Sequence, residues 1–154
     1  MPPLILETPL GLKEFVGREI GVSDWFLVTQ ERIAQFAAAT EDHQWIHEDR
    51  ERAARESPYG TTIAHGFLTL SLIPHLAEQV FQVRGGERMR VNYGLNRVRF
   101  PAPVAAGSRI RARVALRSLK ELPDCVEAEV LVTVEVENTA KPSCVAEWLM
   151  RFYT

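Results

Sequence analysis

Long stretches in which apolar and polar residues alternate fill the C-terminal half of the chain, and they constrain its fold more than any other feature. Apolar residues at every second position alternate with arginine in 109–117 and mostly with glutamate or threonine in 126–136, and the period returns in 146–152. Such a period buries one face of a strand and exposes the other. With 89–100, the pattern predicts four long antiparallel strands in succession. The arginine-faced and glutamate-faced strands are expected to be neighbours with complementary outward charges.

A segment that is apolar on nearly every side precedes these strands, from Gly66 to about Phe81. That pattern is typical of a buried helix, which Pro74 is expected to kink or split. One buried helix followed by half-buried strands favours an α+β fold in which a curved sheet wraps around the helix. The chain has 154 residues without internal repeats or a linker, so we expect one domain, 1–154. Upstream we expect a short helix over 12–17, a strand over 19–28, a helix over 30–40 capped by Thr29 and a short helix capped by Asp49.

Composition excludes several classes of function. A formal net charge of −2 gives no indication of binding to nucleic acid or to an anionic membrane. The apolar run after Gly66 is interrupted by Pro74 and His75, so no segment is expected to span a membrane. The first residues do not resemble a signal peptide, which favours a cytoplasmic protein. Cys125 and Cys144 are then expected to be reduced, buried thiols.

Two segments with reactive side chains lie between the predicted helices. Asp42 and His47 are five residues apart, and Thr61 to Gly66 follow shortly afterwards. Five residues of helix turn by about 140°, so Asp42 and His47 converge only if the preceding helix ends near Thr40 and the chain bends. A carboxylate and an imidazole that converge can share one water molecule. A glycine that opens a helix can offer bare backbone N–H groups to a carbonyl oxygen.

Simpler explanations compete with each of these assignments. A turn carboxylate such as Asp42 often binds local backbone, and His47 fits a buried, hydrogen-bonded imidazole. His65 fits a role in orienting the turn before the helix. Ser71 can bind a carbonyl one turn earlier. The acids and histidines of 42–49 match no zinc pattern, so no metal is expected.

A further polar face is predicted downstream. Asn92, Gly94 and Asn96 fall on one face of the strand over 89–100. Such a face either lines a substrate tunnel or marks a bulge.

The order of these features resembles a known family. A helix, Asp42-x4-His47, Ala64-His65-Gly66, Ser71 and long strands resemble the MaoC-like (R)-specific enoyl-coenzyme A hydratases of the hot-dog fold, and among them the NodN-like branch. The resemblance covers 17–153. That family usually has Gly-Asp-x-Asn-Pro-(Ile/Leu/Val)-His. In this chain Glu41 replaces the glycine, and Gln44-Trp45 replace Asn-Pro.

The resemblance implies roles for individual residues. Asp42 and His47 match the catalytic pair, Gly66 matches the helix N-terminus that receives the thioester oxygen, and Ser71 matches a residue that supports the pair by hydrogen bonding. With Asn96 from the polar strand face, Gly66 and Ser71 are the expected substrate-binding residues. A homodimer whose sheets join edge to edge is also implied, with the pantetheine arm near the interface.

The expected activity is reversible syn hydration of a trans-2-enoyl-coenzyme A to the (R)-3-hydroxyacyl-coenzyme A. It needs no nicotinamide, flavin or metal cofactor, and coenzyme A enters only as part of the substrate. Two alternatives stay open: a hot-dog acyl-coenzyme A thioesterase, which attacks the carbonyl carbon, and a non-catalytic acyl-binding or signalling dimer. Acyl-chain preference and the first proton acceptor are not determined by the sequence, although Trp45 and Phe67 are candidates for setting chain length.

Overall fold

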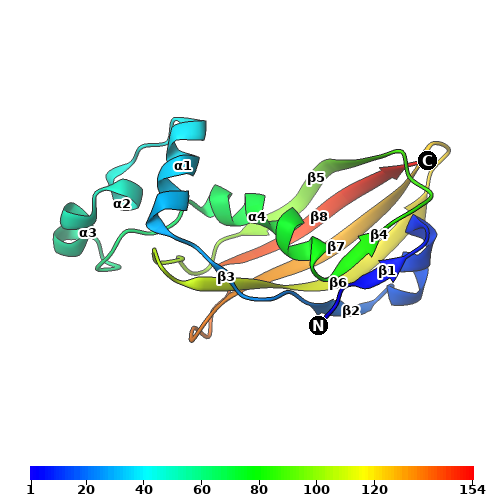
Figure 1. Cartoon of the computed structure of the whole chain (residues 1–154), viewed down its shortest axis with the longest axis horizontal. Coiled ribbons are helices and arrows are strands. Elements are labelled where there is room, and N and C mark those ends of the chain that lie inside the picture. Colours follow the sequence, from blue (N-terminus) through cyan, green and yellow to red (C-terminus); the bar gives the residue numbers. More distant parts are fainter.

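A curved antiparallel sheet packed against one helix forms the body of the protein (Figure 1). The computed structural model describes all residues from 1 to 154. The sheet order is β2 (Arg18–Val22), β6 (Arg109–Glu121), β7 (Cys125–Val136), β8 (Cys144–Tyr153) and β5 (Met89–Arg99), and β3 (Phe26–Leu27) also pairs with β6. The helix is α4 (Gly66–Glu78). The predicted α+β class and the four long strands are confirmed.

One hydrophobic core lies between α4 and the sheet. It contains 27 buried residues, among them the alternating apolar side chains of β6, β7 and β8. Val114, Val130 and Val132 are each 0% exposed. Burial of one such side chain stabilises the fold by about 1.5–3 kcal/mol, which explains why the period of two predicted these strands correctly.

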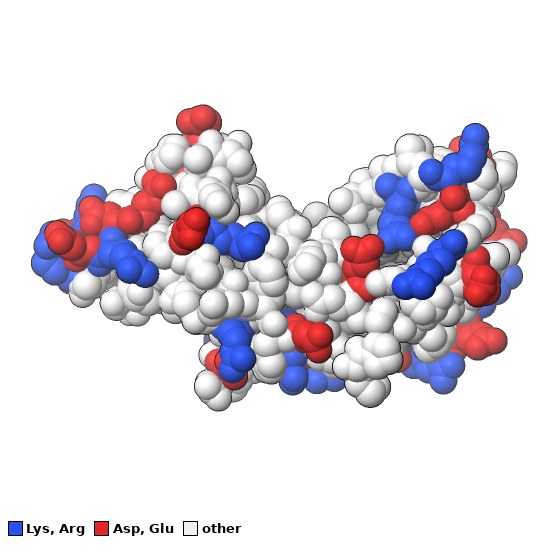
Figure 2. Space-filling view, viewed as in Figure 1, with Lys and Arg blue, Asp and Glu red and all other residues white.

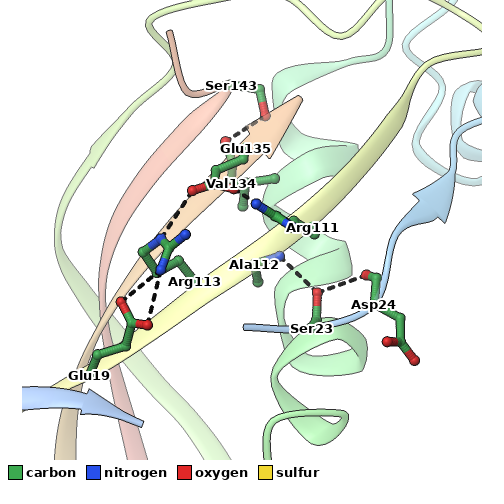
Figure 3. A network of polar contacts seen from close by, with 9 residues as sticks. All are labelled: Glu19, Ser23, Asp24, Arg111, Ala112, Arg113, Val134, Glu135 and Ser143. Atoms are coloured by element: carbon green, nitrogen blue, oxygen red, sulfur yellow. Dashed lines mark hydrogen bonds and ion pairs between the residues drawn. The ribbon is translucent and has the colours of Figure 1, made fainter. Parts of the chain in front are cut away.

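Complementary charges line the outer face of the sheet, as expected (Figure 3). Glu135 on β7 accepts hydrogen bonds from Arg111 at 2.7 Å and from Arg113 at 3.0 Å on β6. Arg113 also donates to both carboxylate oxygens of Glu19 on β2 at 3.0 Å. Exposed ion pairs of this kind contribute at most about 1 kcal/mol each, so their main effect is on the register of neighbouring strands.

The N-terminal predictions need correction. The short helix is a 3-10 helix, η1 (Pro9–Phe15), and the strand expected over 19–28 is divided into β2 and β3. The division occurs at Ser23, because its hydroxyl accepts the N–H of Ala112 at 2.8 Å and donates to the carbonyl of Asp24 (Figure 3). Leu4–Leu6 (β1) and Phe81–Val83 (β4) form a separate parallel pair.

Helix α4 differs from its prediction in two respects. It runs through Pro74 without a break and ends at Glu78, because Phe81 belongs to β4. The prediction that α4 is buried on nearly every side is also wrong, since Phe67 is 68% exposed. The sheet covers only one side of α4, and Phe67, Ser71 and Pro74 form an exposed stripe on the other side.

Three helices project beyond one end of the sheet (Figure 1): α1 (Gln30–Thr40), α2 (Trp45–Glu48) and α3 (Arg50–Glu56). Both predicted caps are confirmed, since the side chain of Thr29 accepts the N–H of Arg32 at 3.1 Å and that of Asp49 accepts the N–H of Arg52 at 3.0 Å. None of the helices is long and apolar enough to cross a membrane.

The two cysteines are free and buried, as predicted. Cys125 lies opposite Tyr153 and Cys144 opposite Val134, at the two ends of the β7–β8 pair. Burial raises the pKa of the Cys144 thiol to about 11.

Candidate active site

Asp42 and His47 converge because α1 ends where the sequence predicted. Glu41 takes a left-handed conformation with φ 62°, which stops the helix after Thr40, and the chain re-enters a helix at Trp45. One ring nitrogen of His47, one of His65 and one carboxylate oxygen of Asp42 then lie within 4.8 Å of one another. A water molecule with hydrogen bonds of about 2.8 Å bridges atoms roughly 4.6 Å apart. The spacing therefore suits one shared water.

Hydrogen bonds fix the tautomer of His47. The ring is buried, with 6% of the residue exposed, and its Nδ1 lies 2.7 Å from the carbonyl oxygen of Ile63. Because a carbonyl can only accept, Nδ1 carries the hydrogen. In the neutral ring Nε2 then keeps a lone pair, which can accept a proton from water.

A second group of contacts anchors the backbone around His47. Its carbonyl accepts the side-chain N–H of Gln30 at 2.7 Å, and Gln30 in turn accepts the hydroxyl of Thr62. The N–H of Ile63 donates to the carbonyl of Ile46 at 3.0 Å. These bonds join α1, α2 and the loop before α4 into one unit, and sequence spacing gave no signal for Gln30 or Thr62.

Burial lowers the pKa of His47 below its ordinary value of 6.5, and the ring of His65 lowers it further. The Ile63 carbonyl, Asp42 and Glu48 act in the opposite direction. The net direction favours the unprotonated ring at neutral pH. Asp42 is exposed, and its nearest protein donor is the N–H of Gln44 at 3.5 Å, so the carboxylate keeps acceptor sites for a ligand.

His65 lies against this pair. Its ring stacks on the His47 ring with 3.7 Å between centroids and 22° between planes. Its Nε2–H donates to the backbone carbonyl of Asp42 at 2.9 Å. The sequence suggested only that His65 orients the turn before α4. The stacking had no sequence signal, because eighteen residues separate the two histidines.

The first turn of α4 leaves two backbone donors free. The N–H groups of Leu68 and Thr69 donate to the carbonyl of His65, whereas those of Gly66 and Phe67 meet no acceptor in the protein. They lie at the positive end of the helix, where an electronegative oxygen is stabilised. Gly66 lines a 220 Å³ cavity, and a Cβ there would lie 3.2 Å from the ring of Phe100.

Ser71 and Asn96 do not join the pair. Ser71 is exposed and lines a 340 Å³ cleft between α4 and the strands β5 and β8, together with Asn92 and Trp148. Asn96 donates to Glu129 on β7 at 3.1 Å, which places its side chain on the outer face of the sheet. Two bulges in β5 cause this, since they interrupt the alternation between Asn92 and Asn96. The bulge explanation of this polar face is therefore correct for Asn96.

Asp42, His47 and His65 also have the mutual spacing of a three-ligand metal site. The sequence did not indicate this cluster, because the third residue comes from another segment. Each histidine already uses one nitrogen on a backbone carbonyl, which leaves one per ring. A water molecule donates two hydrogen bonds, so two of these acceptors, such as the Asp42 carboxylate and Nε2 of His47, suffice to hold it without a metal.

Known proteins resemble the chain over most of its length. A family model described as MaoC like domain matches residues 12–139. The 3-hydroxyacyl-thioester dehydratase Z of Mycobacterium tuberculosis (strain ATCC 25618 / H37Rv) is 52% identical over 147 residues, which are 95% of this chain and 96% of the relative. Nodulation protein N of Rhizobium leguminosarum bv. viciae is 47% identical over 139 residues, which are 87% and 84% of the two chains.

A solved structure supports the same architecture. The (R)-hydratase from A. caviae involved in PHA biosynthesis superposes with a TM-score of 0.66 and 24% sequence identity, over 84% of this chain and 94% of that one. At this level of identity the likeness concerns the fold, and it confirms the predicted hot-dog architecture.

Proposed function

The chain belongs to the MaoC-like domain family, and we propose that it catalyses the reversible dehydration of (R)-3-hydroxyacyl thioesters to trans-2-enoyl thioesters. The observation that carries the proposal is the approach of the Asp42 carboxylate and the His47 ring to within 4.8 Å, together with the ring of His65, the residue that precedes the free N–H groups of α4. The 52% identical relative is named a 3-hydroxyacyl-thioester dehydratase, which supports the same reaction class. We propose coenzyme A as the carrier of the acyl group.

In the hydration direction His47 is the proposed base. Its Nε2 takes a proton from the water held between it and Asp42, while the water oxygen bonds to Cβ of the enoyl thioester. The electrons of the double bond move toward the thioester oxygen. The N–H groups of Gly66 and Phe67 stabilise the enolate charge there, and one such donor is worth about 3 kcal/mol.

The same proton completes the reaction. His47 returns it to Cα on the face from which water attacked, so one water supplies both the hydroxyl group and the hydrogen. The Asp42 carboxylate orients the water and stabilises the transient imidazolium. Dehydration follows the reverse path, in which neutral His47 removes the α-proton, and no cofactor is needed for either direction.

The cleft along α4 is the proposed site of the acyl chain. Cavities of 340 and 510 Å³ share Ser71, Pro74, Asn92 and Trp148. Ser71 lies five residues beyond Gly66, about 7.5 Å along the helix, which suits a chain that extends from a carbonyl bound at the N-terminus. Trp148 donates to Asn92 at 3.2 Å, and the fixed indole presents an apolar wall.

We propose a homodimer formed through the edge strand β5. Apolar side chains are exposed at this edge and on the neighbouring end of α4: Phe67 is 68%, Leu95 44% and Phe100 39% exposed. Figure 2 shows that the middle of this face carries few charged side chains. An exposed apolar edge strand is a surface that a second strand covers. Since Leu95 also lines the cleft, a partner would close the acyl site.

Light scattering tests the dimer. Leu95→Lys is expected to shift the mass from two chains to one. Leu27→Lys is the matched control, because Leu27 is 50% exposed on β3, on the opposite part of the sheet. A wild-type mass of one chain would refute this part of the proposal.

One assay separates the proposed activity from its two alternatives. The protein is incubated with crotonyl-coenzyme A, and the absorbance of the conjugated enoyl thioester is followed together with free thiol. Loss of absorbance without thiol is the result expected for hydration. Release of thiol would identify a thioesterase, and binding without either change would identify a non-catalytic acyl-binding protein.

A further inference from the structure

His65, the residue before α4, contacts both members of the water-binding pair. Its side chain is buried, with 3% of the residue exposed, and the ring lies between His47 and Phe36, with centroid distances of 3.7 and 4.9 Å. We propose that His65 is a positioning residue of the reaction: its Nε2–H holds the backbone of Asp42, and its ring stacks on that of His47. This inference rests on the proposed hydratase activity.

The first role concerns Asp42. This residue follows the left-handed Glu41 in a bend, and the only protein donor near its carboxylate is 3.5 Å away. The bond from His65 to the Asp42 carbonyl, at 2.9 Å, connects the bend to a buried side chain. Without that bond the carboxylate is free to move away from the water, and small displacements of a catalytic group are costly.

The second role concerns His47. The charged or titratable groups that face it are Asp42 after α1, Glu48 on α2 and His65 before α4. The two acids favour protonation of His47, whereas His65 opposes it across a ring separation of 3.7 Å. His65 therefore offsets the acids and helps to preserve the Nε2 lone pair that attacks water.

A packing role alone does not account for a histidine here. Its Nε2–H donates to the Asp42 carbonyl at 2.9 Å. An apolar ring would fill the space between Phe36 and His47 but would leave the Asp42 carbonyl without this donor. The arrangement makes sense if the position needs the Nε2–H donor and the ionisable ring.

The first test measures His47 directly, independently of catalysis. Ring signals of the histidines are followed by NMR through a pH titration in the full chain, and His47 is identified from a His47→Ala spectrum. In His65→Gln the amide N–H can still reach the Asp42 carbonyl, but the ring is lost. The His47 midpoint is expected to rise by about half a unit or more. His75→Gln, at an exposed histidine on α4 that is not among the groups facing His47, should leave it nearly unchanged. An unchanged midpoint in His65→Gln would overturn the second role.

The second test measures turnover of crotonyl-coenzyme A. His65→Ala removes both roles, and kcat/KM is expected to fall about 10²-fold, whereas His65→Gln keeps the donor and should stay within about tenfold of wild type. In both variants the acid limb of the pH profile should move to higher pH. If both variants lost the same amount of kcat/KM and kept the acid limb of the wild-type pH profile, His65 would be a packing residue only.

The two proposals fail separately. Thermal unfolding establishes that each variant is folded, and if His65→Ala does not fold, the His65→Gln titration and pH limb still decide. If wild-type protein hydrates no enoyl thioester, the proposed function fails, while the NMR titration continues to test the contact between the histidines. If wild-type protein hydrates the enoyl thioester normally, and the His65 variants change neither the acid limb of the pH profile nor the titration midpoint of His47, only the His65 inference fails.

Discussion

Gly66→Ala separates the role of the α4 N-terminus in catalysis from its role in folding. The added Cβ would lie 3.2–3.3 Å from three atoms of the Phe100 ring, closer than the roughly 3.5–4.0 Å of an unstrained carbon contact. Phe100 is 39% exposed, so the ring can shift by a few tenths of an ångström. That strain, of about 1 kcal/mol, is offset by the higher helix propensity of alanine, which is also worth about 1 kcal/mol.

Stability is therefore expected to change little, whereas catalysis is expected to suffer. The methyl group would stand beside the free N–H groups of Gly66 and Phe67 and keep the thioester oxygen at a distance. Loss of one such donor reduces turnover about 10²–10³-fold, or about 2.7–4 kcal/mol. The assay combines thermal unfolding with initial rates of crotonyl-coenzyme A hydration. Turnover close to wild type in a folded Gly66→Ala would refute an oxyanion site at this helix.

Two further variants control for steric effects. Gly11→Ala is the matched control, because its Cβ would lie 3.1 Å from the Leu6 side chain, outside the site. It should leave the rate unaffected. The double variant Gly66→Ala/Phe100→Ala relieves the crowding while the methyl group remains. Recovery of turnover in that double variant would show that a displaced ring, and not a blocked amide, caused the loss.

Three other predictions address the pair and its product. Because burial lowers the pKa of His47 below 6.5, kcat/KM for hydration should keep its plateau below pH 6.5 and fall only at lower pH; a fall that begins above 6.5 would contradict a buried neutral base. Dialysis against EDTA should change the hydration rate by less than about twofold, and a loss that Zn²⁺ restores would show that Asp42, His47 and His65 hold a metal. Chiral analysis should find the (R)-3-hydroxyacyl thioester, and an (S) product would contradict the proposed face of attack.

The parts of the fold that could be predicted are those that follow from periodicity. The alternation in β6, β7 and β8 reports burial on one face, which each strand possesses by itself. The burial of α4 was less predictable, because Phe67 is apolar and yet exposed. A single sequence does not distinguish an apolar residue packed in the core from one that is exposed on the surface.

The site was predictable to the extent that it is local. Thr40 and Glu41 end α1, and this ending allows Asp42 and His47 to meet. The contribution of His65 depends on a ring contact between distant segments, and periodicity carries no information about such contacts. Asn96 was misplaced because two bulges in β5 change which residues share a face, and bulges leave no regular mark in the spacing.

The most direct test of the account compares Asp42→Asn and His47→Ala with wild type in crotonyl-coenzyme A hydration, with His43→Ala as a control at an exposed neighbouring histidine. Both site variants should remain folded and lose at least about 10²-fold in kcat/KM, while the control stays within about threefold. Near-normal turnover in either folded site variant would contradict the claim that these two side chains hold and deprotonate the attacking water.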